Sequence, residues 1–392
     1  MEKIVYLLVY LIYFTTPFES IAIAPNFSIV KLITILFILS AVIYFKNVPS
    51  TKNSFLKLFA IYTLYGLSST IWSIDKETTF LFSIGTIVPS FILIIYLYHS
   101  IKNKTHIDNV FKAYALGSSI AAIVALHAFI YGNVFASQNA EGRLTVFGQD
   151  QNELSFLFSF GIVSFIYLIK YGPLNKFEKI LSVLCSLILT YAILITGSRT
   201  GFIILISIGL VLILMNLKSI KILLILPLLL IIGIKMFQFL PESLTQRLLQ
   251  TSEQISERDF TGRGYIWQRG WNAFMQTDAQ IQGTGLKTFR TLLAQTYDGW
   301  SKAPHNTYLS TFIELGIIGF TIFLGMIINL TKKVYFLAKK ESIFFILLLL
   351  PLLIAMITLG LEGRRWLYLI GILIIKLSQL IQINEFNHIK HV

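Results

Sequence analysis

Residues 303–320, A-P-H-N-T-Y-L-S-T-F-I-E-L-G-I-I-G-F, join the longest polar segment of the chain to an apolar run. This order of segments is typical of a loop that enters a membrane-spanning helix. His305 is therefore expected where a helix meets water, with Asn306 as the N-cap of that helix. Gly316 and Gly319 predict a point at which another helix approaches closely.

The composition indicates a helical membrane protein. Of 392 residues, 55% are hydrophobic and 13% are charged, and the mean hydropathy is +0.74. The charged share is about half that of an ordinary soluble domain, which argues against a soluble enzyme. Continuous apolar runs of about 20 residues predict spanning helices, because a barrel would need short alternating segments. The predicted fold class is all-α, a polytopic membrane protein with about twelve transmembrane helices.

Polar residues or glycine and proline separate the apolar runs. The predicted spans are 4–24, 29–45, 55–74, 79–99, 110–131, 153–170, 178–197, 200–216, 220–240, 305–330, 343–360 and 365–383. We expect residues 1–392 to form a single membrane domain, with 241–304 as its one longer extracytoplasmic loop. The first run contains Pro17 and Glu19 without a small-residue cleavage site, which favours a retained span over a signal peptide. A lone cysteine, Cys185, allows no intramolecular disulfide.

Lysines in the short connections set the predicted orientation. They fall in alternate loops: Lys46, Lys52, Lys57, Lys102, Lys104, Lys112, Lys170, Lys176, Lys179, Lys218, Lys221, Lys332, Lys333, Lys339 and Lys340. The positive-inside rule assigns these loops to the cytoplasm. Both termini are then cytoplasmic, and His305 faces the extracytoplasmic side.

The arginines show the opposite distribution, because all nine are predicted at or near the extracytoplasmic side. They are Arg143, Arg199, Arg247, Arg258, Arg263, Arg269, Arg290, Arg364 and Arg365. Guanidinium groups bind phosphate oxygens in a bidentate manner that lysine cannot reproduce, which favours a site for a phosphorylated anion. The alternative is that some arginines pair with nearby acids, namely Glu253, Glu257, Asp259 and Glu362. The net charge of +13 therefore indicates an anionic lipid ligand and no nucleic acid.

Within the long loop, residues 263–276 predict an amphipathic helix, since its apolar side chains recur at helical spacing. Two tryptophans, Trp267 and Trp271, suit a helix lying at the membrane interface. The alternative is a helix that packs on the outer ends of the spans. Either arrangement holds Arg263 and Arg269 near the level of lipid phosphates.

His305 is the candidate catalytic residue. An imidazole can accept the proton of a sugar hydroxyl as its oxygen attacks an electrophile. The structural alternative is an interfacial histidine that bonds to a headgroup or to a backbone carbonyl.

Two further polar sites precede helices. Arg199 lies in the turn 197–201, where backbone N–H groups and a guanidinium could bind phosphate together, or where an arginine could simply extend to the interface. Arg143 and the polar residues 149–153 could contact sugar hydroxyls, or could form a solvated loop. Asn152, Asn306 and Glu314 are the candidate glycan contacts.

No metal or other cofactor is predicted. The sequence has no Asp-x-Asp pair and no His/Cys cluster with the spacing of metal ligands. Arginines are therefore expected to neutralise a diphosphate leaving group.

His305-Asn306, nine residues and Gly316-x-x-Gly319 resemble the His-Asn/Ser/Gln-x9-Gly-x-x-Gly signature of the O-antigen ligase superfamily. That superfamily includes O-antigen ligases, O-antigen and capsule polymerases, and protein-glycosylating transferases. Other matching pieces are Thr196-Gly197-Ser198-Arg199-Thr200-Gly201, Arg263-x-x-x-Trp267, Gly283-x-Gly285 with Phe289, and Arg143-x-x-x-Phe147-Gly148 with Asn152. The resemblance extends over residues 143–319.

The resemblance implies a metal-independent inverting glycosyltransferase of the membrane GT-C type in the bacterial cytoplasmic (inner) membrane. Its donor would be an undecaprenyl-diphosphate-linked oligosaccharide or polysaccharide, and its acceptor a sugar hydroxyl. His305 would be the general base, and Arg199 and Arg263 would hold the diphosphate, with Arg269 and Arg143 as further candidates. Besides the lipid bilayer, a chain-length regulator and a flippase are expected partners.

The signature does not separate a polymerase, which extends another lipid-linked repeat unit, from a ligase, which uses lipid A core. The short outer loop favours a polymerase slightly. A more distant alternative is a flippase or transporter of lipid-linked glycans. It would require charged or broken spans near the bilayer midplane, and such segments are not evident in the sequence.

Overall fold

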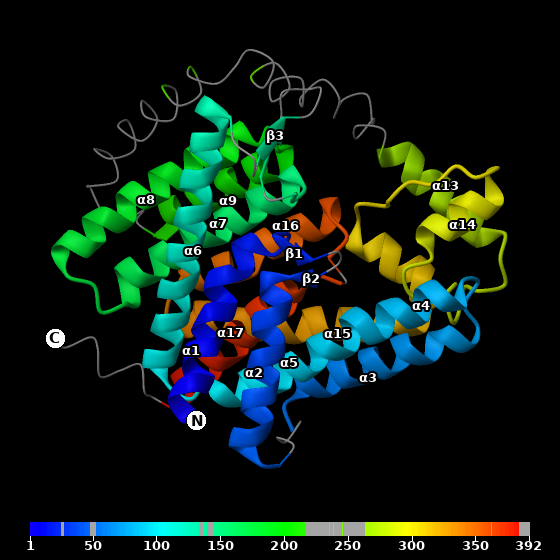
Figure 1. Ribbon diagram of the computed structural model, residues 1–392, viewed down its shortest axis with the longest axis horizontal. Coiled ribbons are helices and arrows are strands. Elements are labelled where there is room, and N and C mark those ends of the chain that lie inside the picture. The colour runs from blue at the N-terminus through cyan, green and yellow to red at the C-terminus, as the bar shows by residue number, and fades with distance from the viewer. Residues whose placement is uncertain are drawn as a thin grey trace.

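The helices of the computed structural model follow the apolar runs of the sequence (Figure 1). The structure describes residues 1–24, 27–47, 52–132, 136–138, 144–146, 148–215, 235, 238, 245, 263–361 and 363–383. In the first half of the chain the helical elements are α1 (Glu2–Thr15), η1 (Thr16–Phe18), α2 (Ile29–Phe45), α3 (Ser54–Ser68), η2 (Ser69–Ile71), α4 (Lys76–Phe82), η3 (Ser83–Ile87), α5 (Val88–Ser100), α6 (Lys104–Tyr131), α7 (Gln151–Tyr171) and α8 (Lys176–Ile195).

The second half begins with α9, which follows α8 after a turn of three residues. Its helical elements are α9 (Arg199–Met215), α13 (Arg263–Met275), α14 (Phe289–Thr296), α15 (Thr307–Lys340), η4 (Ile343–Leu348), α16 (Leu350–Thr358) and α17 (Arg365–Gln382). Two short antiparallel hairpins complete the described elements: β1 (Ala22–Ala24) with β2 (Phe27–Ser28), and β3 (Ala136–Gln138) with β4 (Leu144–Val146).

Eleven of the twelve predicted spans correspond to helices at the expected places. The ninth, 220–240, lies outside the described residues apart from positions 235 and 238. Among the described residues, six helices are long and apolar enough to cross a membrane, and further apolar helices are shorter. The molecule is therefore a helical membrane protein.

The first apolar run differs from the predicted 4–24 span, because α1 ends at Thr15. Pro17 follows in the 3-10 turn η1, and β1 comes next. Proline has no backbone N–H to continue an α-helical ladder, and its ring crowds the preceding turn. The run thus turns at Pro17 before the chain enters α2.

Helices α7 and α17 are the most buried of the long apolar helices that the structure describes. Most of the apolar window of each is buried, and aromatic side chains join them. Trp366 of α17 stacks on Phe156 of α7 with ring centroids 4.4 Å apart. Tyr368 of α17 stacks on Phe59 of α3 with ring centroids 4.1 Å apart, which connects α17 to α3.

The peripheral helices expose apolar faces. On α8, Phe177 is 72% exposed and Ile180 is 61% exposed. Similar side chains project from α2 and α9, including Leu39, Ile43 and Leu210. Large apolar faces of this kind are stable against lipid and unfavourable in water.

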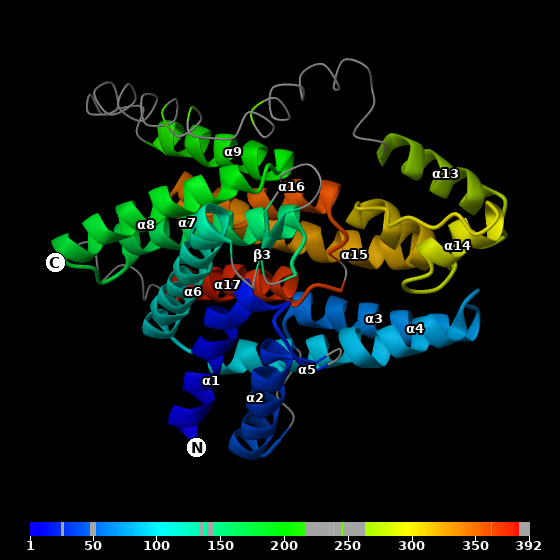
Figure 2. The ribbon, with the colours of Figure 1, turned by 45° about the horizontal axis from the view of Figure 1, so that its top comes forward.

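Helices α13 and α14 lie together at the end of the bundle where α15 begins (Figure 2). They share a small second core with the first turns of α15, in which Phe274, Phe289 and Ile313 are buried. The predicted helix 263–276 is confirmed as α13. Within its apolar stripe Gly270 and Phe274 are buried, whereas Trp271 and Met275 are 43% and 42% exposed.

Helix α15 is broken at Gly316, whose φ of 62° and ψ of −169° are non-helical. The loop 280–285 fills the break with backbone hydrogen bonds. Ile317 N–H donates to the Gln280 carbonyl (3.0 Å), and Gly285 N–H donates to the Glu314 carbonyl (2.8 Å). A Cβ at Gly316 would lie 2.3 Å from the Ile281 carbonyl oxygen, so only glycine fits there.

Gly319 behaves as the sequence predicts. A Cβ at this position would lie 3.0 Å from the ring of Tyr65, so Gly319 lets α3 pack closely on α15. Gly316 differs, because backbone of the 280–285 loop approaches it instead of a helix.

Candidate active site

The segment that carries His305 is fixed by the residues that follow it. Asn306 is the N-cap of α15, as predicted, and its Oδ1 accepts a hydrogen bond from Leu309 N–H at 3.0 Å. Thr307 Oγ1 donates to the Leu359 carbonyl (2.7 Å) and accepts from Leu361 N–H (2.9 Å). The start of α15 is therefore attached to the loop that follows α16.

His305 itself is half-buried and has a φ of 45°. Left-handed backbone is uncommon for a residue with a Cβ, and it is enriched at functional sites. The strained backbone sets the direction of the imidazole relative to α15, which begins two residues later.

Arg199 is the first residue of α9, where the neighbouring Ser198 joins α9 to α7. Ser198 Oγ accepts from Gly201 N–H (3.1 Å) and from Ser155 Oγ (3.0 Å). The same hydroxyl donates to Asn152 Oδ1 at 2.8 Å. These bonds hold the first turn of α9, including Arg199, against the first turns of α7.

The beginnings of α9 and α15 meet at the end of α16. Thr200 Oγ1, beside Arg199, donates to Thr358 Oγ1 at 2.8 Å. The next residue, Leu359, accepts from Thr307 Oγ1, two positions after His305. The structure thus brings the predicted base and the predicted phosphate ligand to the same end of one helix.

Helix α13 adds a third side to this site. Trp267 Nε1 donates to the Pro304 carbonyl at 2.7 Å, so α13 contacts the residue immediately before His305. Arg263 precedes Trp267 by one helical turn, and residues four apart lie on the same helix face. Arg263 is therefore on the face of α13 that is turned toward the His305 segment.

Arg269 has a different environment, because its guanidinium is surrounded by aromatic rings. The guanidinium carbon lies 4.4 Å from the ring centroid of Tyr265, 4.7 Å from that of Tyr297 and 4.9 Å from that of Trp300. Tyr297 also donates its hydroxyl hydrogen to the Arg269 carbonyl at 3.2 Å. These contacts favour a role for Arg269 in joining α13 to the segment after α14.

Two of the candidate glycan contacts, Asn152 and Glu314, are buried side chains that hold neighbouring segments together. Asn152 bonds to Ser198, as described above. Glu314 accepts from the backbone N–H groups of Lys287 (2.8 Å) and Phe289 (3.3 Å) at the start of α14. Their burial and these bonds favour positioning roles over direct contact with a glycan.

The arginines near the end of α16 pair with acids that the sequence did not suggest. Arg364 Nη2 contacts Glu153 Oε1 of α7 at 2.5 Å, and Arg365 Nε lies 3.4 Å from Glu19 Oε1. Both pairs join segments more than two hundred residues apart, so no local pattern reveals them. Arg143 and the acids Glu253, Glu257, Asp259 and Glu362 lie outside the described residues.

Among the described residues, no group of three or more His, Cys, Asp or Glu side chains could hold a metal ion. The site is instead rich in guanidinium groups and hydroxyls. Its chemistry suits an anionic ligand next to an imidazole.

One family of known proteins matches the part of the chain that carries these residues. Residues 184–324 match the family model described as O-antigen ligase. This range includes the Arg199 turn, α13 and the His305 segment, so the resemblance to the O-antigen ligase superfamily is confirmed. No curated protein matches the chain.

Proposed function

Because residues 184–324 match the O-antigen ligase family model, we propose that this protein transfers a glycan from undecaprenyl diphosphate to a sugar hydroxyl on the extracytoplasmic face of the bacterial cytoplasmic membrane. The proposal rests on three hydrogen bonds made by neighbours of Arg199, Arg263 and His305, namely Thr200 to Thr358, Trp267 to Pro304 and Thr307 to Leu359. A base and two guanidinium groups are the parts that such a transfer requires.

His305 acts as the general base. The acceptor hydroxyl oxygen attacks the anomeric carbon of the donor sugar, and its proton passes to the imidazole. The bond between that carbon and the diphosphate oxygen breaks, the electron pair leaves with the diphosphate, and the configuration inverts. A positioned base contributes about 10²–10⁴-fold to the rate of such a step.

Arg199 and Arg263 hold the diphosphate. Negative charge accumulates on the leaving oxygen in the transition state, and fixed guanidinium donors stabilise it without a metal ion. The first turn of α9 adds backbone N–H groups beside Arg199, which favour an anion at a helix N-terminus. Arg143 is a further proposed contact in the same role.

The acceptor is proposed to be a second lipid-linked repeat unit, which makes the protein a polymerase. A ligase acting on lipid A core is the alternative. Surface glycan from a deletion strain separates them by gel electrophoresis. Single repeats attached to the acceptor indicate loss of a polymerase, whereas polymer that stays on the lipid carrier indicates loss of a ligase.

The catalytic assignment is tested by substitution in a deletion background. His305→Ala should reduce transfer by about 10²–10⁴-fold, and Arg199→Ala should reduce it by about 10²–10³-fold. His127→Ala, at an exposed histidine of α6, is the matched control and should retain full transfer. Unchanged surface polysaccharide in both test strains would refute the assignment.

A further inference from the structure

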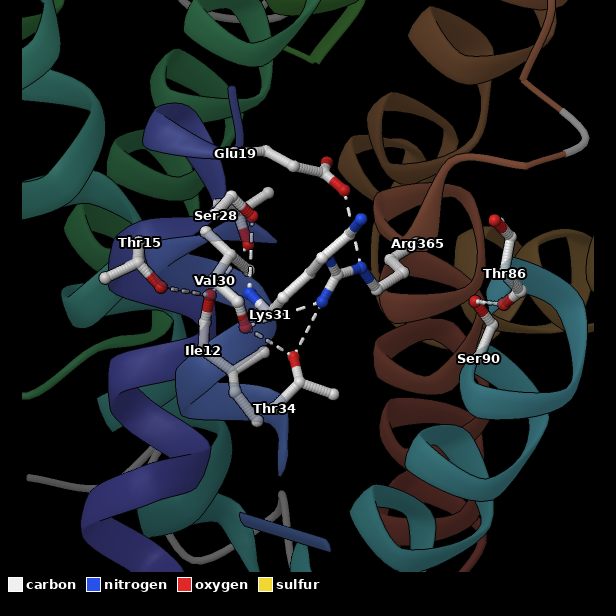
Figure 3. A network of polar contacts seen from close by, with 11 residues as sticks. Ile12, Thr15, Glu19, Ser28, Val30, Lys31, Thr34, Thr86, Ser90 and Arg365 are labelled. Carbon is white, nitrogen blue, oxygen red and sulfur yellow. Dashed lines mark hydrogen bonds and ion pairs between the residues drawn. The ribbon is translucent and has the colours of Figure 1, made fainter. Parts of the chain in front are cut away.

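A cavity of about 540 Å³ lies beside the candidate active site. It is bounded by α2, by η3 and the start of α5, and by the loop that joins α16 to α17. Figure 3 shows part of its wall, with Lys31 and Thr34 on α2 facing Arg365, and with Thr86 and Ser90 on the other side. The proposed transfer reaction assigns no role to this cavity.

The wall carries more cations than acids. Lys31, Lys287, Arg364 and Arg365 line it together with one carboxylate, Glu19. Glu19 pairs with Arg365, whose Nη1 also donates to Thr34 Oγ1 at 2.7 Å (Figure 3). Since Glu153 pairs with Arg364, these two carboxylates offset the two arginines, and the two lysines add positive charge. Such a wall attracts an anion.

Lys287 is held in position at an energetic cost. Its φ is 68°, and its N–H donates to the buried carboxylate of Glu314. Left-handed backbone is unfavourable for a residue with a Cβ. The ammonium lies 5.1 Å from the centroid of the Phe82 ring, and both side chains line the cavity. Lys287 therefore adds a positive charge to the wall from a backbone position fixed by Glu314.

One part of the cavity wall is open and apolar. Ile35 of α2 lines the cavity and is 45% exposed, and it continues into the exposed apolar face of α2. Gly85 also lines the cavity, and a Cβ added there would meet no atom within 4 Å. Gly85 belongs to the π-helical turn η3, and such turns are frequent at functional sites. A ligand with a charged head and an apolar tail matches this arrangement.

We propose that the cavity binds the phosphate or diphosphate headgroup of a membrane lipid, with the lipid chain along the apolar face of α2. Lys31 and Lys287 contact the anion, and the hydroxyls of Thr86 and Ser90 lie on the opposite wall. Two lipids share this chemistry: a second polyprenyl diphosphate that carries the acceptor, and a phospholipid. Binding of the polyprenyl diphosphate rests on the proposed function, whereas binding of a phospholipid does not.

The cavity and the candidate active site share the loop between α16 and α17. Leu359 and Leu361 bind Thr307 at the start of α15, and Arg364 lines the cavity. A headgroup in the cavity would therefore lie against the same loop that holds the first residue of α15.

Native mass spectrometry of the full chain tests the proposal, with undecaprenyl diphosphate and phosphatidylglycerol as separate probes. Gly85→Leu fills the cavity without an initial clash. Gly209→Leu is the matched control, because Gly209 is a helical glycine of α9 that also has no atom within 4 Å of an added Cβ. Lys287→Gln removes a charge, and it serves as the second test if Gly85→Leu fails to fold.

We expect the wild type and Gly209→Leu to retain one bound lipid more than Gly85→Leu, and Lys287→Gln to bind that lipid about tenfold more weakly. Loss of an undecaprenyl diphosphate adduct identifies the polyprenyl carrier, and loss of a phosphatidylglycerol adduct identifies a phospholipid. Equal binding of both probes by the wild type and by the folded variants would overturn the proposal. Transfer by His305→Ala is measured separately, so failure of the proposed function leaves this binding result unaffected.

Discussion

At the scale of single residues, the candidate site is held by side chains that bond to backbone. Trp267 binds the Pro304 carbonyl, Thr307 binds the 359–361 backbone, and Glu314 binds the N–H groups before α14. Each contact joins a helix side chain to the backbone of a loop or of a helix end. The positions of His305 and Arg263 thus depend on neighbours that take no part in the proposed chemistry.

The two arginines of α13 should respond differently to substitution. Arg263→Ala is expected to raise the KM for the lipid-linked donor by about tenfold or more, because a charge-assisted bond to diphosphate is lost. Arg269→Ala removes contacts with three rings, each worth about 0.5–1 kcal/mol at an exposed site. It should therefore lower the Tm of the purified protein more than Arg263→Ala does. The reverse ranking of the two variants in KM and Tm would contradict these roles.

Asp75 gives the molecule a defined response to acid. Its carboxylate accepts from Thr78 N–H (3.0 Å) and Thr78 Oγ1 (2.7 Å), which lowers its pKa below the usual 3.8. Because the folded pKa is depressed, the stabilisation is present above about pH 4 and is lost as the pH falls through the folded value. Asp75→Asn should be less stable than the wild type at pH 7.

The stability difference between the wild type and Asp75→Asn should shrink below about pH 4. Thermal unfolding of both proteins between pH 7 and pH 3 measures it. A difference that stays constant over this range would exclude the carboxylate as its source.

At the scale of elements, the site depends on how closely α7 and α9 pack. Gly201 of α9 faces α7, and a Cβ added there would lie 2.6 Å from Ser155 Cβ. The two helices can approach this closely only because position 201 has no side chain. The approach lets Ser198 reach both Ser155 and Asn152.

Gly201→Ala should force α7 and α9 apart and destabilise the protein by about 1–3 kcal/mol. Gly209→Ala, on the same helix but with no atom within 4 Å of the new Cβ, should be neutral or stabilising by up to about 1 kcal/mol. Denaturation in detergent micelles compares the two variants. Equal effects would show that helix propensity, and not packing against α7, sets the stability at position 201.

At the scale of the whole molecule, the helices were predictable and their arrangement was not. Apolar runs predict helices because backbone groups in lipid must be satisfied within the helix. The run that became α17 is mostly buried, whereas that of α8 exposes most of its apolar window, although both are apolar. Hydropathy does not distinguish lipid from protein as the surroundings, so the packing order could not be read from the sequence.

In the candidate site, the helix ends were predictable from the sequence and the contacts between distant segments were not. The Asn306 cap and the short turn before Arg199 follow from local residue types, and the structure confirms both. The aromatic contacts of Arg269 and the pair between Arg364 and Glu153 depend on side chains from separate segments. Local periodicity carries no information about such contacts.

Two distant segments should exchange their amide hydrogens together at the Gly316 break in α15. The N–H groups of residues 284–285 and 317–318 bond across the break, so we expect opening of one pair to expose the other pair to deuterium. Gly283→Ala would place a Cβ 2.3 Å from the Glu314 carbonyl oxygen and should accelerate deuteration of both segments together. Gly299→Ala has a similarly positive φ but open space, and it should leave both rates unchanged. The part of α15 before Gly316, which follows the proposed base, would then open together with the 280–285 loop. The longer part of α15 after Gly316 would stay closed.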